Sequence, residues 1–216
     1  MPDLRGSPVA EAWMGAHPKA PSEVFAAGNW ITLDRLIEKD PESILGKTVS
    51  RNFQGRLPFL FKILAADSPL SIQVHPNRGR ALEGFARENR MAIPVDSPKR
   101  NYRDGNLKPE LLCALTPFHV LKGFREIDEI LSGLGKVASQ GLGRELEALK
   151  TRPNPEGLRC FFSWLMRMKA PSRKEITDQA ADRARIYARK DNAFSWVMRL
   201  QKAYPGDIGV LFPLIL

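Results

Sequence analysis

The sequence predicts an α+β protein, and two patterns support that prediction. In short stretches of the first 124 residues, apolar and polar side chains alternate, as in strands with one buried face. Over residues 125–203, apolar residues recur every three or four positions, which is typical of packed helices. With 216 residues, 43% of them hydrophobic, the chain can bury a core. We therefore predict strands within 1–124, an all-helical insert over 125–203, and a return strand over 204–216.

The first predicted elements are short. Residues 13–18 indicate a strand that runs into a turn. His17 could be a ligand in principle, but its position before a proline in a Gly- and Ala-rich turn favours a structural role. Thr32 is suited to cap a short helix, and residues 41–45 predict a second helical turn. Residues 57–64 predict a buried strand interrupted by one charge, Lys62. Such a lysine either extends its ammonium group to the surface or enters a pocket, and the pattern leaves both open.

The most informative stretch is residues 70–76. Its alternation predicts a strand that presents Gln73 and His75 on the same face. A second predicted strand, residues 108–115, has Glu110 at its entry and Lys108 on the same side. An amide oxygen, an imidazole nitrogen and a carboxylate together suit zinc or a similar divalent ion. On composition alone, the alternative is a solvated sheet face.

Helical periodicity begins before the insert and dominates it. Residues 80–89 predict a helix, followed by a polar loop over 100–106 that leads to Glu110. Ser172 and Glu175 fit a capping box that opens one long helix reaching Leu200. The inward residues expected in the 80–89 helix are Leu82, Phe85 and Ala86. Three further helices are expected at residues 127–134, 142–149 and 158–166.

Charge and composition exclude several classes of partner. The net charge is +9, but basic residues are interleaved with acids and no nucleic-acid-binding motif is present, so we expect no nucleic-acid partner. A positive field instead favours encounter with a phosphorylated sugar. Because no apolar run approaches about 20 residues, we expect no membrane span and a cytoplasmic protein. Cys113 and Cys160 have no metal-binding spacing and are expected to be reduced core residues.

Eight motifs occur in an order and spacing that carry a family resemblance. They are residues 13–18 (WMGAHP), 57–62 (LPFLFK), 69–77 (PLSIQVHPN), 100–102 (RNY), 108–110 (KPE), 114–118 (ALTPF), 123–125 (GFR) and 204–211 (YPGDIGVL). In these motifs the chain resembles the type I phosphomannose isomerases, which are zinc-dependent enzymes of the cupin superfamily.

The resemblance implies a partial cupin-like β-sandwich, or jelly roll, interrupted by the helical insert. It also implies interconversion of mannose 6-phosphate and fructose 6-phosphate with one bound Zn²⁺ ion. The implied metal ligands are Gln73, His75 and Glu110; the implied catalytic residue is Lys108; and the implied substrate contacts are Ser71 and Lys62. From the residues alone, Lys108 is equally a charge partner of Glu110.

The family's pattern continues past Leu216 and opens with a longer strand before Trp13. Its later strands carry a further histidine ligand and an arginine that this chain lacks. We therefore expect a truncated member that isomerises little alone and whose apolar edge at 208–216 favours association. The alternative function is a non-catalytic metal- or sugar-phosphate-binding cupin remnant. Full-length members are expected to be monomers.

Overall fold

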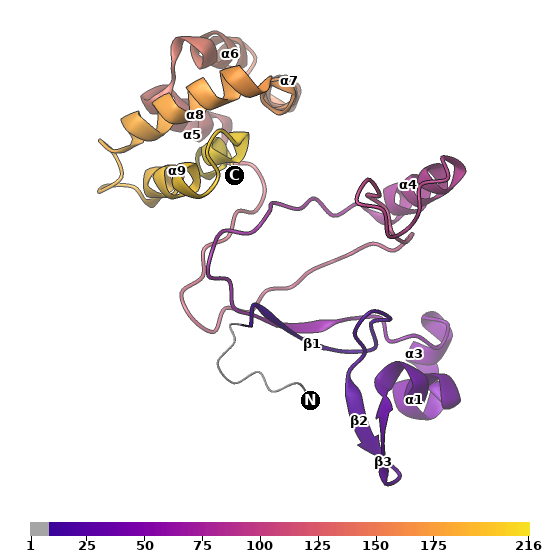
Figure 1. Cartoon of the computed structure of the whole chain (residues 1–216). Coiled ribbons are helices and arrows are strands. Elements are labelled where there is room, and N and C mark those ends of the chain that lie inside the picture. Colours follow the sequence, from indigo (N-terminus) through magenta and orange to yellow (C-terminus); the bar gives the residue numbers. More distant parts are fainter. Residues whose placement is uncertain (1–8) are drawn as a thin grey trace. The chain divides into compact units, whose positions relative to one another are not determined.

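The structure, a computed structural model, describes residues 9–216, so the first eight residues of the predicted 1–124 segment lie outside the described part. The chain divides into two compact units, residues 1–70 and 71–216. Helices and short strands are both present, and the fold is α+β as predicted (Figure 1).

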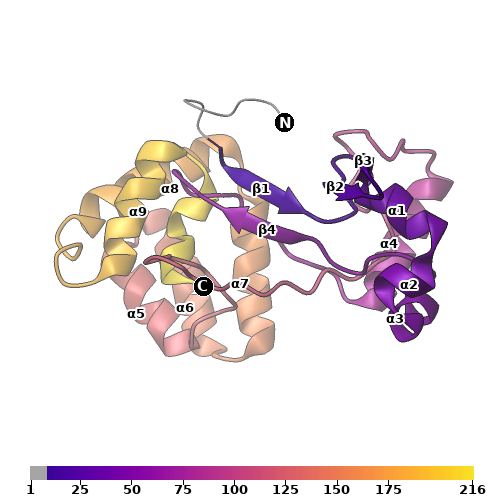
Figure 2. The same ribbon diagram turned by 90° about the horizontal axis from the view of Figure 1, so that it is seen from below.

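Two antiparallel strand pairs form the sheets of the first unit. β1 (Glu11–Met14) pairs with β4 (Phe61–Leu64), and Figure 2 shows these two strands side by side. β2 (Glu23–Ala26) and β3 (Asn29–Thr32) form a hairpin, which the sequence analysis did not anticipate. The expected strand at 57–64 is confirmed only in its second half, because Pro58 has no N–H to donate to a ladder. Its predicted burial was wrong, since Phe61 and Ile63 are 56% and 51% exposed.

Three short helices complete the first unit: α1 (Leu33–Lys39), α2 (Pro41–Leu45) and α3 (Lys47–Asn52). Thr32 occupies the position before α1, as predicted, but its side chain makes no capping hydrogen bond. Asp40 does cap α2, since its carboxylate accepts from the backbone N–H of Ser43 at 3.1 Å. The first two helices are therefore confirmed, and α3 is an addition.

The second unit begins with α4 (Arg78–Arg90), which confirms the helix predicted over 80–89. The predicted inward face was wrong. Leu82 is 53% exposed, whereas Ala81, Gly84 and Glu88 are buried. The inward stripe consists of small residues and one carboxylate because a following loop, not another apolar layer, packs against it.

The strands predicted over 70–76 and 108–115 are absent from the described structure, and both predictions were wrong. A strand needs a hydrogen-bonded neighbour, and alternation along one segment does not guarantee one. Val74 and Leu111 are 92% and 98% exposed, so none of the described residues packs over them. Both stretches are irregular segments leading to and from α4 (Figure 1).

Five helices confirm the helical character of residues 125–203: α5 (Ile127–Val137), α6 (Gln140–Thr151), α7 (Pro155–Arg167), α8 (Ala170–Ala184) and α9 (Asn192–Ala203). The single long helix expected after residue 172 was wrong, and so was its capping box. α8 already starts at Ala170, with Pro171 in its first turn, and Ser172 lies inside it. A new helix starts at Asn192 because Asp191 accepts from the N–H of Ala193 at 2.9 Å.

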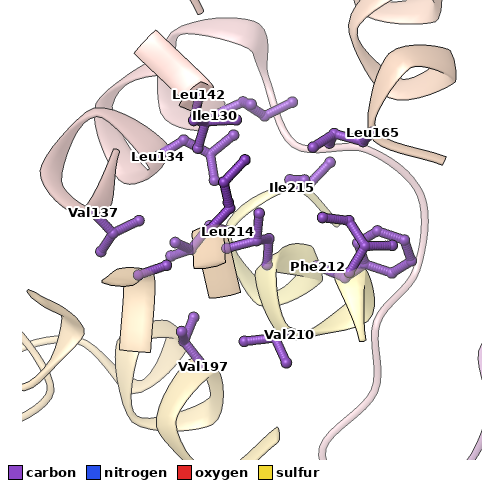
Figure 3. Close-up of a cluster of buried hydrophobic side chains, with 14 of the residues drawn as sticks. Ile130, Leu134, Val137, Leu142, Leu165, Val197, Val210, Phe212, Leu214 and Ile215 are labelled. Carbon is purple, nitrogen blue, oxygen red and sulfur yellow. The ribbon is translucent and has the colours of Figure 1, made fainter. Parts of the chain in front are cut away.

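The expected return strand is also wrong, because residues Ile208–Leu214 form a 3-10 helix, η1. Asp207 caps it by accepting from the N–H of Gly209 at 2.7 Å, and Pro213 cannot donate to a strand ladder. Leu211 and Ile215 are fully buried among α5, α8 and α9, so this segment fills the helical core and does not form an exposed edge. Figure 3 shows Val210, Leu214 and Ile215 of this segment within the cluster of buried side chains.

Both cysteines are reduced, but Cys113 and Cys160 are exposed and the prediction that they are core residues was wrong. Cys160 lies on α7 outside its buried stripe, which consists of Gly157, Phe161 and Leu165. Among the described residues, no helix combines the length and the hydropathy needed to cross a bilayer.

Candidate metal and substrate site

His75 is held close to the start of α4. Two residues after it, the side chain of Asn77 accepts from the N–H of Arg80 at 3.0 Å and caps the helix. Pro76 lies between His75 and Asn77. Its ring restricts its φ angle, and it has no backbone N–H to donate. The polypeptide therefore enters α4 in one defined conformation directly after His75.

The other side of the site is Glu110, which the chain reaches through the loop after α4. That loop is anchored by a buried ion pair, in which Nε of Arg100 lies 3.2 Å from Oε2 of Glu88. Both side chains are almost fully excluded from solvent, at 0% and 4% exposure. A hydrogen bond from the backbone N–H of Tyr102, together with the amide groups of Asn101 and the charge of Arg100, holds the pKa of Glu88 below its ordinary value.

Each nitrogen of the Arg100 guanidinium also donates one hydrogen bond. Arg100 donates to the carbonyl oxygens of Tyr102 and Ile93 and to the side-chain oxygen of Asn89, each at 2.6 Å. Its guanidinium lies over the ring of Phe85. A buried charge pair is tolerated when its remaining donors and acceptors are satisfied, and here they are.

The structure brings His75 and Glu110 together. Nε2 of His75 lies 3.2 Å from Oε1 of Glu110. Nevertheless, this buried nitrogen makes no hydrogen bond with any described residue, because the two atoms approach without suitable alignment. A buried, unsatisfied imidazole nitrogen facing a carboxylate oxygen is an unfavourable arrangement without a further partner.

A zinc ion would be such a partner. Two ligand atoms held about 2.0–2.1 Å from one tetrahedral zinc lie roughly 3.3 Å from each other, which matches the observed separation of 3.2 Å. Within residues 9–216, no cluster of three or more His, Cys, Asp and Glu side chains is suited to hold a metal. Any further protein donor from the described chain must therefore be of another type, such as the amide oxygen of Gln73. The residues present fit a zinc site.

The other residues predicted for this site are exposed. Gln73 and Ser71 lie in the irregular segment before His75, and Lys108 lies two residues before Glu110. Glu110 is itself 71% exposed at its side chain, so the pair opens to solvent on the carboxylate side. The structure thus joins His75 to Glu110 and leaves Ser71, Gln73 and Lys108 accessible on the same two segments.

Lys62 belongs to the first unit, where its side chain is already engaged. It lies in β4 and approaches Oε2 of Glu11 at 3.4 Å, and its ammonium is 4.6 Å from the centre of the Trp13 ring. This arrangement corresponds to the alternative in which the ammonium group of Lys62 extends to the surface. His17 likewise has a local role, since its Nδ1 accepts from the N–H of Lys19 at 3.2 Å.

Sequence reasoning missed Glu88 and Arg100 as supporting residues of the site. The available signal was a Glu at the helical spacing of Ala81 and Gly84, which marks a charged residue on a face of small residues. A buried carboxylate of this kind requires a cation partner nearby, and Arg100 is in the following loop.

The comparisons with known proteins concern the part of the chain that contains this site. The family model for the catalytic domain of phosphomannose isomerase type I matches residues 2–127, more than half of the chain. The chain belongs to the type I phosphomannose isomerase family. The matched range includes all the residues predicted for the site, from Lys62 to Glu110.

The individual relatives are named mannose-6-phosphate isomerase. The chain is 41% identical over 217 residues to mannose-6-phosphate isomerase of Escherichia coli, covering 100% of this chain and 54% of the relative. It is 34% identical over 227 residues to the human mannose-6-phosphate isomerase, covering 94% of this chain and 49% of the relative. The chain therefore spans about half the length of the curated relatives it matches.

Solved structures extend the likeness to the fold. A zinc-bound mannose 6-phosphate isomerase superimposes with a TM-score of 0.86 at 39% identity, covering 100% of this chain and 54% of that one. The Salmonella typhimurium enzyme with zinc and its substrate, fructose 6-phosphate, superimposes with a TM-score of 0.84 at 40% identity, covering 97% of this chain and 52% of that one. Both neighbours bind zinc, and one binds a sugar phosphate.

Proposed function

We propose that this chain carries the metal-binding and substrate-binding part of a zinc-dependent isomerase that interconverts mannose 6-phosphate and fructose 6-phosphate. The observation that carries the proposal is the contact between Nε2 of His75 and Oε1 of Glu110, whose length suits two ligands of one zinc ion. The family membership and the zinc-bound neighbours support the same metal.

In this proposal Gln73, His75 and Glu110 hold the ion. Bound zinc would act as a Lewis acid that favours negative charge on the sugar oxygens. The irregular segments before and after α4 carry these donors, and their exposed side leaves room for a substrate. Ser71, which is exposed, is the proposed contact to the sugar, and Lys62 is the proposed phosphate contact.

An aldose–ketose isomerisation moves one proton between two adjacent carbons of the substrate. Lys108 is the proposed carrier of that proton, because it lies two residues from Glu110 and is free to move at an exposed position. A general acid–base residue typically contributes about 10²–10⁴-fold to the rate. Cytoplasmic location and a monomeric full-length form remain predictions.

The test measures binding before turnover. Calorimetry should show that the purified chain binds one zinc ion and that the zinc-loaded chain binds fructose 6-phosphate. A coupled assay then follows the conversion of mannose 6-phosphate, with Lys108→Met as the variant and Lys136→Met, on α5, as the matched control. If the unsubstituted chain converts mannose 6-phosphate, Lys108→Met should lower kcat by at least about 100-fold and leave the affinity for zinc unchanged.

The outcomes separate the two functions predicted from the sequence. Binding of zinc and sugar phosphate without turnover would favour the non-catalytic alternative. Absence of zinc binding, or binding that is unaffected by loss of His75, would overturn the proposal. Whether this chain isomerises its substrate by itself is decided by the same assay.

A further inference from the structure

The loop that follows α4 returns along the same helix toward its start. Its residues meet α4 at successively earlier positions: the amide of Asn101 contacts Glu88, and the ring of Tyr102 lies against Gly84. Further along, Gly105 packs against the side chain of Leu82.

The contact between His75 and Glu110 continues this order. As the loop proceeds from residue 100 to 110, its partners run backward from residue 89 to 75. The contact between His75 and Glu110 is therefore the last in a series of contacts between this loop and α4 with the residues just before it. In Figure 1 the chain turns back beside α4.

The only charges buried along this arrangement, among the described residues, are Glu88 and Arg100. The guanidinium presents a rigid set of donors, and three carbonyl or amide oxygens accept hydrogen bonds from it, while the carboxylate of Glu88 forms an ion pair with it. A shift of the loop by one residue would leave a buried charge without its partners, which is strongly unfavourable. Gly84 fixes the register independently, because a Cβ there would lie 2.6 Å from ring atoms of Tyr102.

We propose that the Glu88–Arg100 ion pair, with the Gly84–Tyr102 contact, sets the register that carries Glu110 to His75, and that Glu88 and Arg100 are positioning residues of the metal site. This inference rests on the proposed function of that site. Neither residue touches the ion. Their effect on metal binding passes through the placement of the Glu110 carboxylate.

The test uses zinc affinity and the visible absorption of the cobalt-substituted chain, whose band intensity reports the ligand geometry. Arg100→Lys keeps the charge but loses the fork of donors, and Gly84→Ala displaces Tyr102 without altering any charge. Both variants should weaken zinc binding by about tenfold, as the loss of outer-shell support typically does. Their cobalt spectra should approach that of Glu110→Ala.

The matched control is Glu83→Gln, which removes an exposed carboxylate from the same helix. A double variant separates positioning from general destabilisation: in the Glu110→Ala background, Arg100→Lys should cause no further loss of affinity. Circular dichroism confirms that each variant keeps its helices.

Equal affinities and spectra for Arg100→Lys, Gly84→Ala and Glu83→Gln would overturn the positioning role and leave the metal site intact. Additive losses in the Glu110→Ala background would also overturn it. If the parent chain binds no zinc, or binds it independently of His75, the metal site itself is wrong and this inference falls with it.

Discussion

Nε2 of His75 faces Oε1 of Glu110 at 3.2 Å without forming a hydrogen bond, although the two residues are separated in sequence by a complete helix and its return loop. Nε2 of His75 is buried and unsatisfied beside an exposed carboxylate oxygen, and a third partner shared by the two groups would explain this arrangement. In the proposed site that partner is a divalent cation, for which an imidazole and a carboxylate are suitable ligands.

The first prediction concerns the imidazole. Replacing His75 by Ala should weaken zinc binding by more than about 100-fold, because loss of a ligand costs at least as much as the upper range for outer-shell residues. His17→Ala is the matched control, since this histidine makes local contacts, a hydrogen bond accepted from the N–H of Lys19 and an edge-to-face contact with the Trp13 ring. Elemental analysis and a zinc-chelator competition provide the measurement. A retained zinc stoichiometry in His75→Ala would show that the assignment is wrong.

The second prediction concerns acid stability. Because the folded-state pKa of Glu88 lies below its ordinary value of 4.5, ionised Glu88 stabilises the fold above that pH. This contribution is lost as the pH falls below 4.5 through the lowered folded-state pKa. Glu88→Gln should therefore lower Tm at pH 7 and make Tm less dependent on pH in that acid range. Thermal scans over pH 3–7, with Glu83→Gln as control, measure it; identical acid slopes in parent and Glu88→Gln would contradict the pairing.

How far the sequence led to this site depends on the kind of information each residue carries. The motifs containing His75 and Glu110 predicted that these two side chains lie close together, and the structure places their nearest atoms 3.2 Å apart. The strands predicted around them were wrong. Alternation of apolar and polar residues is a property of one segment, whereas a strand also needs a second segment to pair with through hydrogen bonds. Glu88 escaped notice because its burial depends on Arg100, which lies in a loop without periodicity.

The same distinction explains the end of the chain. Residues 208–216 are almost uniformly apolar, and such a run does not separate a buried strand from a buried helical segment. The deciding features were local: the Asp207 cap and Pro213 within the run. Helices α5–α7 were easier to predict, because each buries one stripe with a period near 3.6.

The third prediction tests the role of η1 in the helical core. Leu211 is fully buried, so Leu211→Ala should lower the free energy of unfolding by about 2–5 kcal/mol through lost burial and a residual cavity. Ile186→Ala is the control, since that side chain is 73% exposed and its loss should change stability by less than about 0.5 kcal/mol. Urea unfolding followed by circular dichroism measures both. Equal midpoints for the two variants would mean that this segment is not part of the core.

The last prediction decides between the two roles of Lys62. In β4 its ammonium approaches Glu11 and the face of Trp13, but the pair is partly exposed and contributes less than about 1 kcal/mol to stability. Lys62→Met keeps the aliphatic stem, so Tm should change by only a few degrees. If Lys62 also binds the substrate phosphate, the same substitution removes a charge-assisted hydrogen bond.

That loss is worth about 1.5–3 kcal/mol, so the zinc-loaded Lys62→Met variant should bind fructose 6-phosphate at least about tenfold more weakly. Lys62→Arg, which keeps the charge, should recover most of the affinity, whereas Glu11→Gln should leave sugar phosphate binding unchanged. Calorimetric titration with fructose 6-phosphate and with unphosphorylated fructose separates the phosphate contact from contacts to the sugar. Parent-like affinity for fructose 6-phosphate in Lys62→Met would confine Lys62 to its contacts with Glu11 and Trp13, and the phosphate would then need another basic residue.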